Sequence, residues 1–187
     1  MRNDTSKDLR HDDLLDYRDL FAKLERDVAA FAEAPGGDSH FNATVTAWCL
    51  ADWILADLAR DVAPEGMEDD LLCLTGRRKH RDKIGKDYGA MYEEMRICRD
   101  VAEGLKHAVL NRGDIRTERV VATDGRYGKA LFGFSRYGDP TVRYAIRVEG
   151  KSVDALDVLN AVMERYREFL TRQALITGPS EVDGSQT

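Results

Sequence analysis

Residues 14–31 read LLDYRDLFAKLERDVAAF, and this stretch decides the fold class. Its apolar residues recur at alternating steps of three and four: Leu14, Tyr17, Phe21, Leu24, Val28 and Phe31. That period places them along one face of an α-helix. We therefore predict an amphipathic helix from about Asp12 to Ala34, ended by the turn-forming residues 35–37, Pro-Gly-Gly.

The next segment continues the helical pattern. Asp38-Ser39 predicts an N-cap for a helix from His40 to about Val62. The residues expected on its buried side are Phe41, Val45, Trp48, Leu55 and Val62. A short helix is predicted at Glu68 to Leu74.

Two more long helices are predicted further along the chain. One runs from about Lys86 to Asn111, with an inward face made of Met91, Met95, Cys98, Ala102, Leu105 and Val109. The other runs from about Val153 to Leu175, with Ser152 as its cap. Its inward residues are Leu156, Leu159, Met163, Tyr166 and Leu170.

Between these two helices the apolar period changes to two, which is typical of strands. The predicted strands are Arg116–Thr123, Lys129–Tyr137 and Thr141–Glu149. The predicted fold class is therefore mainly α (α+β). We expect a four-long-helix bundle with a three-stranded antiparallel β-meander, residues 116–149, inserted before the last helix.

The length of 187 residues fits one domain, predicted at residues 12–177 with disordered ends at 1–11 and 178–187. No apolar run approaches the roughly 20 residues that span a bilayer, so we expect no membrane association. The N-terminus has no apolar signal-peptide core. Three scattered cysteines favour reduced thiols, and we predict a cytoplasmic protein.

Charge is distributed unevenly along the chain. Residues 1–70 carry 7 basic and 17 acidic side chains, whereas residues 71–151 carry 18 basic and 11 acidic ones. A basic middle region can attract a polyanion, although a solvated charged surface explains it equally well. The candidate nucleic-acid-binding residues are Arg77, Arg78, Lys79, Arg81, Arg143 and Arg147.

Two predicted helices hold polar residues that a plain bundle does not need. In the first, Asp52 falls four residues after Trp48 and is expected within the apolar stripe, with Asn42 on an adjoining line. In the second, Asp100 and His107 are about two helical turns apart and nearly aligned.

Three further residues of this second helix belong to the same candidate set, and two of them are cationic. Glu103 lies between Asp100 and His107, and Arg99 and Lys106 form a parallel line. Histidine can exchange a proton near neutral pH, and arginine and lysine can stabilise charge on a phosphate. These are the groups that metal-independent RNA cleavage requires.

Two alternatives stay open for these residues. Asp52 would form an internal ion pair with Arg99 or Lys106, with no role in chemistry. Alternatively Asp52, Asp100, Glu103 and His107 would bind a metal. However, the sequence has no second Glu/His pair of the di-iron type and no zinc spacing, so we predict no metal and no cofactor.

Residues 47–53, AWCLADW, and 99–107, RDVAEGLKH, resemble segments of uncharacterised bacterial helical proteins and, more distantly, of the HEPN superfamily of helical ribonucleases. The usual HEPN motif is an arginine, often followed by Asn or Asp, and then a histidine at a somewhat shorter spacing than that from Arg99 to His107. The resemblance covers the helices. It implies a homodimer, RNA as substrate, and a toxin or phage-defence setting in which an antitoxin is a partner.

The leading hypothesis from the sequence is an HEPN-like endoribonuclease or RNA-binding relative. His107, Arg99, Lys106 and Asp100 are its catalytic candidates, supported by Asp52, Glu103 and Asn42. The alternatives are a non-enzymatic dimerising interaction protein and a carboxylate-bridged metalloenzyme.

Overall fold

The structure is a computed structural model that describes residues 14–60, 67–75, 92–106, 117–123 and 141–175. Its helices are α1 (Tyr17–Glu33), α2 (Gly37–Leu58), α3 (Met67–Thr75), α4 (Glu93–Lys106) and α5 (Ala155–Arg172). Its strands are β1 (Thr117–Thr123), β2 (Arg143–Val148) and β3 (Lys151–Asp154). The prediction of a mainly helical protein with a small antiparallel sheet is confirmed. The predicted terminal segments 1–11 and 178–187 lie outside the described residues.

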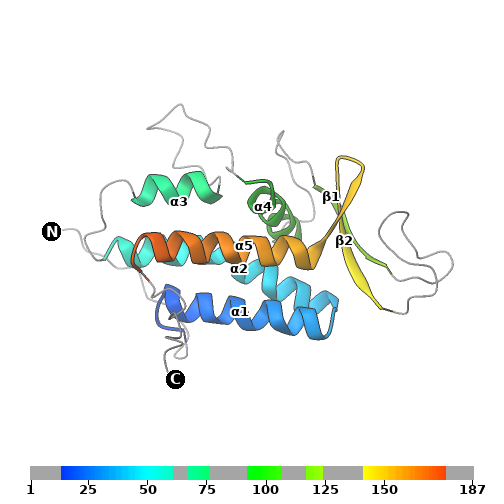
Figure 1. Cartoon of the computed structure of the whole chain (residues 1–187), viewed down its shortest axis with the longest axis horizontal. Helices are drawn as coiled ribbons and strands as arrows, with labels where there is room; N and C mark the ends of the chain where they lie inside the picture. The colour runs from blue at the N-terminus through cyan, green and yellow to red at the C-terminus, as the bar shows by residue number, and fades with distance from the viewer. Residues whose placement is uncertain (1–13, 61–66, 76–91, 107–116, 124–140, 176–187) are drawn as a thin grey trace, which may run out of the picture.

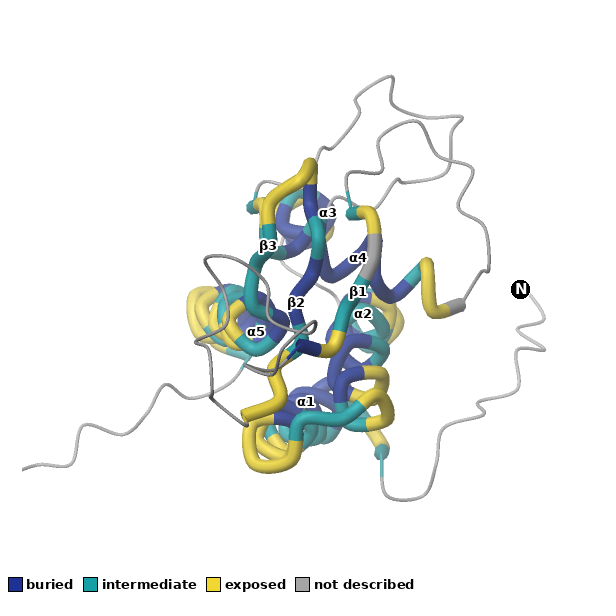
Figure 2. Tube along the Cα trace, turned by 90° about the vertical axis from the view of Figure 1, so that its right-hand side faces the viewer, coloured by how far each residue is buried: buried dark blue, intermediate teal, exposed yellow. Residues whose placement is uncertain are grey.

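Helices α1, α2, α3 and α5 run roughly along one direction, α4 crosses them, and the strands stand at one end of the helices (Figure 1). The core forms where α1, α2, α4 and α5 face one another, as the buried segments in Figure 2 show. Leu24 of α1, Leu50 and Ile54 of α2, and Tyr166 and Leu170 of α5 are completely enclosed in it.

Helix α1 follows the apolar stripe predicted for it. Apart from Leu14, which is half-buried before the helix begins, every residue of that stripe is buried. The helix begins at Tyr17 and not at Asp12, because Asp16 is its N-cap and accepts hydrogen bonds from the amides of Arg18 and Asp19. Such a cap stabilises a helix by about 1 kcal/mol.

Helix α2 begins at Gly37, three residues before the predicted start at His40, and buries a different face from the one predicted. Its core residues are His40, Ala43, Thr44, Thr46, Ala47, Leu50, Ala51 and Ile54. Phe41 is 44% exposed, and Val45, Trp48 and Leu55 are only half-buried. The buried face of α2 thus includes several small side chains, and small residues at a helix contact permit close packing.

The two helices are also joined by a polar contact. Thr46 donates a hydrogen bond of 2.7 Å to Asp27 of α1 and accepts one of 3.0 Å from Lys23. The pairing satisfies a hydroxyl that is only 6% exposed.

The sheet differs from the predicted meander in its strand order. β1 pairs directly with β2, and β2 pairs with β3, all antiparallel. The predicted first and third strands are therefore neighbours, whereas a meander would place the second between them. The predicted strand Lys129–Tyr137 lies outside the described residues.

A tight hairpin makes β3, which the sequence did not indicate. Glu149 and Gly150 have φ angles of 49° and 79°, the left-handed values that a two-residue hairpin turn requires. The chain then pairs with β2 as far as Asp154, opposite Ala145. The predicted cap at Ser152 is therefore wrong: Asp154 caps α5 by accepting a 2.8 Å hydrogen bond from the amide of Leu156.

Candidate functional site

Helix α4 buries an ion pair inside the core. Its predicted inward residues Met95, Cys98 and Ala102 are buried, but so are Arg99 and Asp100, which are 6% and 2% exposed. The guanidinium of Arg99 donates to Asp100 Oδ1 from Nε at 3.3 Å and from Nη2 at 3.2 Å. Neighbouring residues on a helix do not face each other, so the arginine side chain folds back to reach the carboxylate.

Burial makes this pair important for folding. A carboxylate or guanidinium removed from water costs several kcal/mol unless a partner of opposite charge compensates it. Arg99 and Asp100 supply that compensation to each other on α4, at the packed side of the helix. In this conformation Arg99 is not exposed to bind a phosphate in solution.

The other predicted site residues are not all brought together. Asp52 and Asn42 are exposed on α2, and Glu103 is half-buried on α4. The prediction that Asp52 lies within the apolar stripe is wrong. Leu50 and Ile54, two positions before and after it, are buried, and Asp52 lies on the opposite, exposed face of the helix.

The end of the predicted catalytic segment is described only in part. Lys106 is the last residue of α4, and His107 follows it outside the described residues. Leu105, expected inward, is 42% exposed. The geometry of an imidazole next to these cations therefore stays a prediction.

The candidate nucleic-acid surface is also described only in part. Arg77, Arg78, Lys79 and Arg81 lie outside the described residues. Arg143 is exposed at the start of β2, where it lies opposite Thr123. Arg147 is half-buried, and its Nε is enclosed without a hydrogen-bond partner in the part of the chain that the structure describes.

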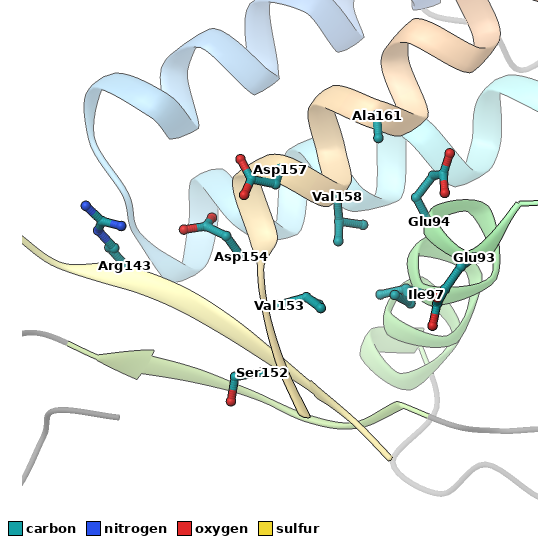
Figure 3. A pocket seen from close by; sticks show the side chains of 10 residues that line it. All are labelled: Glu93, Glu94, Ile97, Arg143, Ser152, Val153, Asp154, Asp157, Val158 and Ala161. Carbon is teal, nitrogen blue, oxygen red and sulfur yellow. The ribbon is translucent and has the colours of Figure 1, made fainter. Parts of the chain in front are cut away.

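Carboxylates surround the surface near Arg143. A cavity of about 550 Å³ between α4, α5 and β3 is lined by Glu93, Glu94, Asp154, Asp157 and Arg143 (Figure 3). A second cavity, of about 340 Å³, adjoins the first. Three residues line both cavities: Arg143, Asp154 and Asp157. We call these two cavities together the acidic groove. Its charge is unfavourable for a nucleic-acid backbone.

His40 occupies a site that the sequence interpretation missed. It was assigned no role beyond the start of a helix, yet it is only 4% exposed. Its ring stacks on Tyr144 of β2 with centroids 5.8 Å apart, lies 5.4 Å from the ring of Phe31, and its Nε2 is 3.4 Å from the hydroxyl of Thr44. Burial lowers the pKa of His40 below its usual value. The sequence did contain a pattern that indicates burial of His40, because His40, Thr44, Ala47 and Ala51 recur at the spacing of one helix face.

Among the described residues, no group of three or more His, Cys, Asp or Glu side chains is placed to hold a metal ion. No helix in the described ranges combines the length and apolar character needed to cross a bilayer.

Comparison with models of protein families, with curated proteins and with solved structures finds no match to this chain. The class of protein is therefore defined by its own features: a mainly helical domain with a small antiparallel sheet, a buried Arg99–Asp100 pair and an acidic groove.

Proposed function

We propose that the protein is an HEPN-like, metal-independent endoribonuclease or an RNA-binding relative of such enzymes. The observation that carries the proposal is the buried Arg99–Asp100 ion pair. It begins the segment of α4 that ends at Lys106, directly before His107. An arginine followed by an aspartate, buried and mutually oriented, provides the rigid support that a catalytic segment needs.

The proposed reaction is transesterification at an RNA phosphate. A base takes the proton of the 2′-hydroxyl, the oxygen attacks phosphorus, and an acid returns a proton to the departing 5′-oxygen. The products are a 2′,3′-cyclic phosphate and a free 5′-hydroxyl. His107 would exchange the proton, and the Lys106 ammonium would stabilise the additional negative charge on phosphorus.

Within this proposal, burial gives Arg99 and Asp100 a supporting role. Arg99 is a positioning residue that holds the helix ending at Lys106, directly before His107, and Asp100 orients its guanidinium. The homodimer that the resemblance implies would bring two His107 residues together, one as base and one as acid. The four long helices that carry the resemblance, the cytoplasmic toxin or defence setting, and an antitoxin partner belong to the same proposal.

The test is RNA cleavage in the presence of EDTA. Purified full-length protein is incubated with total RNA at pH values between about 5 and 9, next to His107→Ala and a matched control, His11→Ala. We expect the wild-type protein and the control to cleave and His107→Ala to be inactive. Absence of cleavage by the wild-type protein at every pH, together with no RNA retention in a filter-binding assay, would overturn the proposal.

A second candidate function is a non-enzymatic interaction protein. The observation that favours it is the separation of the predicted site residues: Asp52 and Asn42 are exposed on α2, whereas Arg99 and Asp100 are enclosed on α4. In that case the ion pair serves only to stabilise the helix packing. An inactive wild-type protein that binds no RNA but elutes as a dimer in size-exclusion chromatography would support this candidate.

A further inference from the structure

The acidic groove combines apolar walls with acidic side chains from separate elements. Ile97 of α4, Val153 of β3, and Val158 and Ala161 of α5 contribute apolar surface to it. Figure 3 shows Asp154 and Asp157 close to each other at the start of α5, with Glu93 and Glu94 across the groove on α4. A groove of this kind suits a long side chain with an apolar stem and a charged end.

The groove carries negative charge that the described residues do not fully compensate. Glu94 forms a 2.9 Å ion pair with Arg165, and Glu93, with its side chain 66% exposed, lies 3.7 Å from Arg96. In contrast, within the described ranges Asp154 accepts only the amide of Leu156, and Asp157 has neither a hydrogen bond nor an ion pair.

The only Lys or Arg among the described lining residues is Arg143, at the junction of the two cavities. Among the residues that the structure describes, it forms no ion pair, although Asp154 and Asp157 line the same two cavities. A cationic ligand that reached the two aspartates would therefore not have to displace an ion pair. It would meet two available carboxylates and one repelling guanidinium.

We propose that the acidic groove is a docking site for a lysine- or arginine-rich peptide segment of a partner protein. The alkyl stems of such a segment would pack against Val153, Val158 and Ile97, and its cationic ends would meet Asp154 and Asp157. Charge complementarity selects a cationic peptide because the same carboxylates repel a phosphate backbone. The inference is independent of the proposed ribonuclease activity, which involves the other end of α4.

Fluorescence anisotropy of labelled octalysine, titrated with the full-length protein, measures this binding. Asp154→Asn and Asp157→Asn each remove one charge from the groove, and asparagine at position 154 retains the ability to cap α5. The matched control is Asp69→Asn, an exposed residue of α3 that changes the net charge by the same amount. We expect each groove variant to weaken octalysine binding about fivefold and the control to leave it unchanged.

Arg143→Gln provides a test with the opposite sign. Removing the guanidinium that lines both cavities should tighten octalysine binding about threefold, an effect that a general loss of structure would not produce. Three results would overturn the proposal: no octalysine binding up to about 1 mM protein, equal weakening by Asp69→Asn, or binding of oligouridylate that Asp157→Asn abolishes.

Discussion

Replacing Asp100 by alanine tests whether the buried ion pair of α4 supports the fold. The substitution removes the carboxylate that pairs with the guanidinium of Arg99, whose side chain is only 7% exposed, and with it the acceptor of two hydrogen bonds. Breaking a buried pair by removing one partner costs about 3–5 kcal/mol. A domain of ordinary stability, about 5–15 kcal/mol, would stay folded but be clearly weakened.

The measurement is urea unfolding followed by tryptophan fluorescence. The Asp100→Ala variant should show a lower free energy of unfolding with an unchanged dependence on urea concentration. The double variant Arg99→Met with Asp100→Leu replaces the pair with apolar side chains and should recover most of the loss. A cost below about 1 kcal/mol for Asp100→Ala would refute the reasoning, because it would mean that Arg99 finds other compensation at no cost.

Three further predictions concern local features. Burial lowers the pKa of His40 below 6.5, so the folded protein favours the neutral imidazole. The stability that the buried neutral ring contributes is fully present above pH 6.5 and is lost as the pH falls through the lowered pKa. Thermal unfolding at about pH 7.5 and about pH 5 should therefore show a larger loss for the wild-type protein than for His40→Phe, and equal losses would contradict this. Asp16→Ala removes the N-cap of α1 and should lower the unfolding free energy by about 1 kcal/mol, whereas Asp16→Asn should be nearly neutral in the same urea assay. Gly150→Ala places a side chain at a φ of 79° and should cost about 1 kcal/mol, whereas Gly150→Asn should cost less; a stabilising alanine would disprove the strain.

The helices were predictable to different degrees. In α1 every buried position carries a large apolar residue, so size and period point to the same face. In α2 they disagree, because its buried face includes the small residues Ala43, Ala47 and Ala51 and leaves Phe41 partly exposed. A prediction that relies on the large residues therefore selects the wrong face as buried, and it wrongly places Asp52 on the buried face.

The candidate site was predictable only at the level of residue types. Arg99, Asp100 and Glu103 were assigned to one helix, and they lie on α4. Nothing in their spacing distinguishes a side chain that is open to a ligand from one that is enclosed. The acidic groove could not be predicted, since it joins α4 with residues of β3 and α5 that are about 60 positions later in the chain.

The sequence by itself determined the helical class, the stripe of α1, the short helix α3 and the existence of strands between residues 116 and 149, because these depend on the local period of apolar side chains. Tertiary structure alone decided the rest: the direct pairing of β1 with β2, the extension of the sheet into β3, the buried face of α2, and the enclosure of Arg99 with Asp100. Each of these depends on which surfaces distant in sequence come into contact, and the free energy of that contact exceeds local preference.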